Sequence, residues 1–186
     1  GAIGVPGFDW ECRIVDEHIQ PLGAGKPGEL LIRGPGVMKE YYRNPEATAA
    51  TLRNGWLHTG DIARMDEDGF VWLIDRKKDV IISGGENIYP NEIENFLVTH
   101  EHILDVAVIG IPDERLGEIV AAIIAPKPGR AVSEADILAF CKGLPRYKRP
   151  RKIIIGEVPR NPTGKIEKPA LRKKYAASID VAGLSA

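Results

Sequence analysis

Residues 75–94 read DRKKDVIISGGENIYPNEIE, and the order of residue types in this stretch decides the fold that we expect. The first five residues are all charged, and charged side chains cannot be buried unpaired between apolar strands. They therefore predict a solvated linker between two domains, which is also compatible with a hinge, because a few element-terminal residues can absorb a backbone change. Val80–Ile82 predicts a short strand, and Ser83-Gly84-Gly85 predicts a tight turn, because glycine tolerates positive φ.

Toward the N-terminus the chain reads mostly as strand. Short alternating or β-branched runs bounded by Gly and Pro are typical of strands, and they lie at Glu11–Asp16, Glu29–Arg33, Ile62–Met65 and Phe70–Ile74. Asp66-Glu67-Asp68-Gly69 predicts a hairpin turn between the last two. Asn44 as N-cap and Pro45 at the first helical position predict a short helix that ends near Leu52.

Toward the C-terminus strands and helices alternate irregularly. Amphipathic spacing predicts a helix over Asn91–Thr99, and Ser133 with Asp136 forms a partial capping box for a helix that ends near Leu144. The remaining expected elements are strands at Val106–Ile111, Ile119–Ala125 and Lys152–Ile155, with Pro112-Asp113 in the loop between the first two, and a last helix at Pro169–Ala177. This pattern predicts a compact α+β fold.

Composition excludes several classes of protein. Lys plus Arg (25) nearly balance Asp plus Glu (26), which argues against a nucleic-acid binder. No apolar run approaches the roughly 18 residues of a membrane helix, so we expect no integral membrane segment. Cys12 and Cys141 match no metal spacing, so we expect no metal site and a reducing, cytoplasmic setting. Residues 1–16 read as mid-chain sequence without a signal peptide, and we expect a piece of a longer protein.

Three further loops carry groups that are capable of chemistry, each with an ordinary alternative. Asp61 follows Thr59-Gly60, and a Gly-Asp pair at a strand end can present a carboxylate to a diol such as ribose; a plain turn is the alternative. Residues 159–165 read PRNPTGK, where two prolines stiffen a loop whose lysine can meet a phosphate or carboxylate. An ordinary surface lysine is the alternative there. Residues 147–151, YKRPR, form an aromatic and basic loop, for which the alternative is an exposed loop without a ligand.

Taken together, in this order and spacing, these motifs resemble the adenylate-forming superfamily of acyl-CoA synthetases, peptide-synthetase adenylation domains and luciferases. The similarity runs from about Gly28 to Tyr175. It rests on GWLHTGD at 55–61, DRKKD at 75–79, SGGENIYPNEIE at 83–94 and PTGK at 162–165. The long middle signature makes the resemblance far more specific than any single motif.

The resemblance implies roles for the matching residues in forming an acyl-adenylate. Asp61 would bind the ribose hydroxyls of ATP, and Arg76 would assist at the same ribose. Lys165 would contact the substrate carboxylate and the α-phosphate region. A fixed cation there would relieve the repulsion between the attacking carboxylate and the phosphate.

It also implies roles in the transfer to coenzyme A. Lys78 would be the hinge about which the C-terminal domain rotates. Gly85, with Gly84 beside it, would let the pantetheine arm of CoA pass close to the backbone. In CoA ligases the stretch at 147–151 often meets the nucleotide end of CoA, which would involve Tyr147, Arg149 and Arg151.

The implied architecture has three parts. Residues 1–75 would be the β-rich end of the large N-terminal adenylation domain, 76–177 a small, mobile, mixed α/β C-terminal domain, and 178–186 a tail. The phosphate loop and acyl pocket of the family lie upstream, so ATP and Mg²⁺ would be bound mainly outside this chain, which alone would be inactive. The form of the middle signature is most like fatty-acyl and aryl-acid CoA ligases. Nothing in the pattern selects one acid or one oligomeric state.

Two other functions remain compatible with these residues. An adenylation domain that loads a carrier protein would use the same first step, but its acceptor would be a phosphopantetheine arm. A non-catalytic module would bind only a partner or a nucleotide. The presence of Asp61, Arg76 and Lys165 argues against a non-catalytic module.

Overall fold

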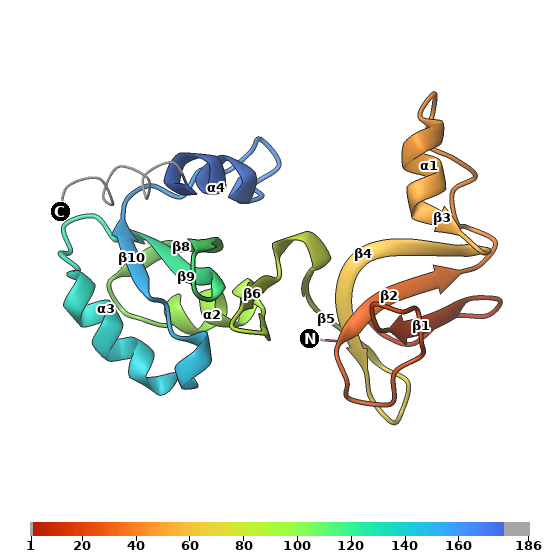
Figure 1. Ribbon diagram of the computed structural model, residues 1–186, viewed down its shortest axis with the longest axis horizontal. Helices are drawn as coiled ribbons and strands as arrows, with labels where there is room; N and C mark the ends of the chain where they lie inside the picture. The colour runs from red at the N-terminus through yellow and green to blue at the C-terminus, as the bar shows by residue number, and fades with distance from the viewer. Residues whose placement is uncertain (1, 177–186) are drawn as a thin grey trace. The chain divides into compact units, whose positions relative to one another are not determined.

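The computed structural model describes residues 2–176 and divides the chain into two compact units, one up to Lys78 and one from Asp79 (Figure 1). Both units combine strands and helices, so the expected α+β class is confirmed. Within the described range, no helix combines the length and apolar character needed to span a bilayer. The expected tail at 178–186 lies outside the described residues.

The first unit is an antiparallel sheet with the order β1-β2-β4-β3, in which β5 also pairs with β4. Its strands are β1 (Glu11–Val15), β2 (Gly28–Arg33), β3 (Leu52–Arg53), β4 (Trp56–Met65) and β5 (Val71–Arg76). β4 is the long, bent strand of the unit (Figure 1), and it begins six residues before the strand expected at Ile62. The core of this sheet is formed by Ile14, Leu30, Ala63 and Val71.

The local signals in this unit had the expected effects. Helix α1 (Pro45–Thr51) begins after Asn44, whose side chain accepts a hydrogen bond from the backbone N–H of Ala47. Gly69 takes a positive φ of 82° in the turn between β4 and β5, which confirms the predicted hairpin.

The second unit is a mixed sheet centred on β9. β9 (Gly117–Pro126) pairs in parallel with β10 (Lys152–Ile155) and antiparallel with β8 (Ile103–Asp113). The first residue of β9 also pairs with β6 (Ile81–Ser83), and β6 pairs in turn with β7 (Glu86–Ile88). The helices are α2 (Pro90–Leu97), α3 (Glu134–Phe140) and α4 (Lys168–Ala176), and the 3₁₀ turns are η1 (Lys77–Asp79), η2 (Cys141–Gly143) and η3 (Arg146–Lys148).

Alternation along β8 and β9 creates two cores, one on each face of this sheet. Val106 and Val108 belong to the core that also holds residues of α2 and α3. Ala107 and Ile109 belong to the other core, which is closed by Leu171 of α4. Helices therefore cover both faces, with α4 opposite α2 and α3 (Figure 1).

Other element boundaries also differ from expectation. Pro112 and Asp113 lie in β8, paired with Glu118 and Gly117, and not in the loop that follows. Proline is tolerated there because β8 is an edge strand. The helix that begins after Ser133 ends at Phe140, and the chain continues as the 3₁₀ turn η2. At its N-terminus the capping box of Ser133 and Asp136 is complete.

Candidate functional site

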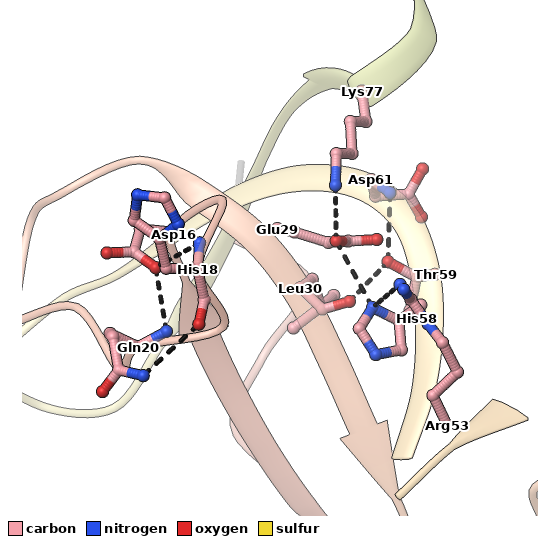
Figure 2. A network of polar contacts seen from close by, with 10 residues as sticks. All are labelled: Asp16, His18, Gln20, Glu29, Leu30, Arg53, His58, Thr59, Asp61 and Lys77. Atoms are coloured by element: carbon pink, nitrogen blue, oxygen red, sulfur yellow. Dashed lines mark hydrogen bonds and ion pairs between the residues drawn. The ribbon is translucent and has the colours of Figure 1, made fainter. Parts of the chain in front are cut away.

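Asp61 lies inside β4 at a bulge, and not at a strand end as the sequence suggested. Residues 29–31 of β2 face residues 58–62 of β4, so β4 carries extra residues at this point. Gly60 permits the bulge by taking a φ of 69°. The backbone N–H of Asp61 donates to Thr59 Oγ1 at 3.0 Å (Figure 2), which fixes the direction in which the carboxylate leaves the strand.

The structure brings Asp61 and Arg76 together as a cross-strand pair. The two residues are in register between β4 and β5, and Arg76 Nε lies 2.9 Å from Asp61 Oδ1. The Asp61 side chain is 24% exposed and that of Arg76 is 54% exposed, so both charged groups can be reached from solvent. A carboxylate that accepts hydrogen bonds beside a guanidinium that donates them suits a vicinal diol.

A buried carboxylate that sequence reasoning missed lies close by (Figure 2). Glu29 is only 7% exposed, and its Oε2 accepts a hydrogen bond from Lys77 Nζ at 2.8 Å. His58 Nδ1 lies 3.4 Å from the same oxygen and 2.8 Å from Arg53 Nη2. Because a guanidinium can only donate, we take Nδ1 as the acceptor from Arg53, and the Glu29 contact as a close approach without a hydrogen bond. A lone glutamate at a strand start gives no sequence signal for such a network.

The charge of Glu29 is maintained by its neighbours. Burial alone raises the pKa of Glu29, but the hydrogen bond and charge of Lys77 outweigh burial and hold the pKa below its ordinary value. Lys77 is thereby anchored to the first unit.

The charged run at 75–79 is only partly the solvated linker that we expected. Asp75 and Asp79 are 6% and 8% exposed, whereas the three residues between them are exposed. Asp79 is buried because Arg172 of α4 pairs with it at 2.8 Å, and Asp75 accepts the backbone N–H of Arg76. Lys78 is exposed at the boundary between the two units.

Gly84 and Gly85 form the two-residue turn of the β6–β7 hairpin. Their φ values are 59° and 86°, both in the left-handed region that suits this turn. A Cβ on Gly84 would lie 3.3 Å from the Leu116 side chain, but a Cβ on Gly85 would have no neighbour within 4 Å. The Gly85 backbone therefore faces open space, where a ligand can approach it closely.

Lys165 ends an ordered loop. The Asn161 side-chain oxygen accepts hydrogen bonds from the backbone N–H groups of Thr163 (3.1 Å) and Lys165 (2.9 Å) and from Thr163 Oγ1 (2.7 Å). The backbone N–H of Asn161 donates to the Lys165 carbonyl at 2.9 Å, and Gly164 takes a φ of 82°. The Lys165 side chain is exposed, so a cation is held out from a fixed backbone.

The basic loop at 147–151 contains exposed side chains and one arginine that is bound to the preceding turn. Tyr147 is 48% exposed and Arg151 is also exposed. Arg149 donates from Nε to the Leu144 carbonyl at 2.8 Å and from Nη2 to the Lys142 carbonyl at 2.9 Å. Its guanidinium therefore braces the preceding turn, which leaves less of it for a ligand. Among the described residues, no cluster of three or more His, Cys, Asp or Glu side chains is arranged to hold a metal ion.

Comparison with known proteins identifies the family of this chain. Residues 92–165 match the sequence profile of the family described as "AMP-binding enzyme C-terminal domain", and residues 1–42 match that of "AMP-binding enzyme". A long-chain-fatty-acid–CoA ligase of Mycobacterium tuberculosis is 49% identical over 154 residues, which are 82% of this chain and 30% of that protein. A feruloyl-CoA synthase of Amycolatopsis is 42% identical over 177 residues, 94% of this chain and 36% of that protein.

Solved structures with the same fold show a similar relationship. ATP-bound MatB from Rhodopseudomonas palustris superposes with a TM-score of 0.88 at 37% identity, over 95% of this chain and 36% of that one. The fold and the motifs are those of the AMP-binding enzymes. The chain belongs to the AMP-binding enzyme family and spans about a third of the length of the relatives that it matches.

Proposed function

We propose that the protein containing this chain is an acid–thiol ligase that forms AMP. A carboxylate oxygen attacks the α-phosphorus of ATP, the bond to pyrophosphate breaks, and an acyl-adenylate forms. The thiol of CoA then attacks the acyl carbon, AMP leaves, and the thiol proton passes to solvent. The observation that carries this proposal is the exposed Lys165 at the end of a loop whose backbone is fixed by Asn161.

In the first step the residues of this chain bind and orient the nucleotide. Asp61 would accept the ribose hydroxyls, and Arg76 would hold the carboxylate in place while it donates to the same ribose. Lys165 would place its charge between the carboxylate and the α-phosphate, where negative groups converge in the transition state. Mg²⁺ would neutralise phosphate charge and, as the resemblance to the family implies, would be bound mainly outside this chain.

In the second step the small domain would present a different surface. We propose that residues 1–75 are the β-rich end of the large domain and that 76–177 are the mobile domain, which rotates about Lys78. The anchored Lys77 and the paired Asp79 on either side support Lys78 as the point where the chain bends. Rotation would withdraw Lys165 and bring the Gly84-Gly85 turn to the pantetheine arm, with Tyr147, Arg149 and Arg151 toward the nucleotide of CoA.

The relatives support a substrate class, and the cysteines of this chain support a setting. The relatives include a long-chain-fatty-acid–CoA ligase, a feruloyl-CoA synthase and an indoleacetate–CoA ligase, which supports a fatty or aryl acid as the substrate. The use of ATP and CoA, and free thiols at Cys12 and Cys141, support a cytoplasmic setting.

The products of the full-length enzyme test the proposed reaction. With a fatty or aryl acid, ATP, Mg²⁺ and CoA, we expect AMP, pyrophosphate and acyl-CoA in equal amounts. ADP and phosphate as products would rule out adenylate chemistry. Transfer to a phosphopantetheinylated carrier protein but not to free CoA would favour the carrier-loading alternative, and nucleotide binding without any turnover would favour a non-catalytic module.

Replacement of Asp61 by Ala is expected to weaken ATP binding at the ribose. Loss of hydrogen bonds to a charged acceptor costs about 1.5–3 kcal/mol each, which corresponds to at least a tenfold rise in KM for ATP. Steady-state kinetics of adenylate formation measure this. The KM for CoA, determined with a supplied acyl-adenylate, serves as the control and should change little. An unchanged KM for ATP would show that Asp61 does not bind the ribose.

A further inference from the structure

β8 is an edge strand whose outward amides are covered by side chains. Among the described residues it pairs only with β9. The backbone N–H of Val106 donates to Asp105 Oδ1 at 2.9 Å, and that of Val108 donates to Glu94 Oε1 at 2.7 Å. Unpaired edge amides normally need such protection. Two carboxylates are therefore fixed side by side along this edge, one from β8 itself and one from α2.

Each of these carboxylates also binds a cation from the segment that contains Lys165. Arg160 donates from Nε to Asp105 Oδ2 and from Nη2 to Asp105 Oδ1, both at 2.8 Å. Lys168 Nζ lies 2.8 Å from Glu94 Oε1. The two cations lie five residues before and three residues after Lys165 in the chain, so the segment is held to the edge of the sheet on both sides of the lysine.

The contact to Asp105 reaches the backbone next to Lys165. Arg160 uses its third nitrogen, Nη1, to donate to the Gly164 carbonyl at 2.6 Å. The planar guanidinium thus joins a carboxylate on the sheet to the residue before Lys165, and a two-pronged contact fixes orientation as well as distance. Val158 and Ile166, which flank the loop of Asn161 in the chain, pack against the core on the α4 face of the sheet.

A bulge places Asp105 for this contact. The register of β8 against β9 shifts between Ile103 and Asp105, and Leu104 between them is 58% exposed. The hydrogen bond from Arg160 lowers the pKa of Asp105 more than burial raises it, so the carboxylate is charged at neutral pH.

We propose that Asp105 is a positioning residue for Lys165, acting through Arg160 and the Gly164 carbonyl, with Glu94 and Lys168 as the second attachment. The inference rests on the proposed function, because it gives Asp105 a role only if Lys165 contacts the reacting groups. Asp105 itself touches neither substrate nor nucleotide. Its effect is to keep the ammonium of Lys165 at a fixed place relative to the sheet, and displacement of a catalytic group by about 1 Å can cost on the order of 100-fold in rate.

The test compares the two half-reactions in the full-length enzyme. In Asp105→Asn the side-chain oxygen still accepts the Val106 amide, but the charge and the two-pronged contact to Arg160 are lost. We expect adenylate formation to fall about 10- to 100-fold, while thioester formation from a supplied acyl-adenylate and CoA stays within about twofold. Arg160→Lys keeps the positive charge but cannot make the two parallel hydrogen bonds to Asp105. It should therefore reproduce the loss in adenylate formation.

Two further variants separate positioning from general stability. Glu92→Gln removes a different ion pair of α2, that with Lys148, which is not connected to the Lys165 loop, and it should leave adenylate formation unchanged. Asp105→Asn added to Lys165→Ala should lower the residual adenylation rate no further, because a residue that acts through Lys165 has no effect without it. A purely structural residue would lower that rate again.

Each outcome decides the inference. Equal losses in both half-reactions, or an additional loss in the double variant, would overturn the positioning role. Normal adenylation in Asp105→Asn, with adenylation strongly lowered in Lys165→Ala, would overturn the inference but leave the proposed function intact. Normal adenylation in Lys165→Ala would instead contradict the proposed function.

Discussion

Lys165→Ala in the full-length enzyme is expected to lower acyl-adenylate formation by about 10²–10³-fold, while thioester formation from a supplied acyl-adenylate continues. The carboxylate and the α-phosphate both carry negative charge as they approach, and removal of one preorganised electrostatic partner typically lowers kcat by about 10²–10³-fold. The second step begins after pyrophosphate has left, so it does not need this cation. Pyrophosphate release measures the first step, and acyl-CoA formed from synthetic adenylate measures the second.

A neighbouring lysine provides the matched control for this experiment. Lys173 is also exposed and lies on α4, away from the loop of Asn161, so Lys173→Ala should leave both half-reactions unchanged. Equal loss of both steps in Lys165→Ala would point to a damaged domain, and retention of both would make Lys165 an ordinary surface lysine.

The elements of the fold were largely predictable because each depends on residues close together in sequence. Asn44 and Pro45 define the start of α1, and Gly69 defines the hairpin turn. The boundaries that were missed depend on pairing partners far away in the chain. Pro112 continues β8 because Glu118 lies opposite it, which the local Pro-Asp signal does not reveal.

The candidate site also combines features that local sequence predicts with features that depend on distant residues. The positions of Asp61, Lys165 and the Gly84-Gly85 turn follow from motifs, because spacing and residue type carry the signal. The partners that orient these groups do not follow from motifs. Asp79 pairs with Arg172 across 93 positions of sequence, so a charged run that reads as a solvated linker has a buried end. Such pairings come from the way α4 packs on the sheet.

Lys168→Met is expected to destabilise the second unit more than any surface substitution. Lys168 Nζ lies 2.8 Å from Glu94 Oε1, and the two side chains are only 9% and 11% exposed. Without the lysine, the Glu94 carboxylate would remain buried beside the Val108 amide without its ion-pair partner. Breaking a buried ion pair from one side costs about 3–5 kcal/mol, because the remaining charge has lost its water without compensation.

Hydrogen exchange of the β8 and β9 amides in the full-length protein measures this effect within one unit, where a global melting curve would mix several domains. A cost of about 3 kcal/mol corresponds to protection factors more than 100-fold lower. Glu94→Gln combined with Lys168→Met should recover most of the protection, because the amide oxygen still accepts the Val108 N–H and no charge is buried. Lys148→Met, which breaks the more exposed pair with Glu92, should cost about 1 kcal/mol or less. Equal losses in Lys168→Met and Lys148→Met would show that burial gives the Glu94 pair no special weight, and the edge of β8 would then be held mainly by its apolar contacts.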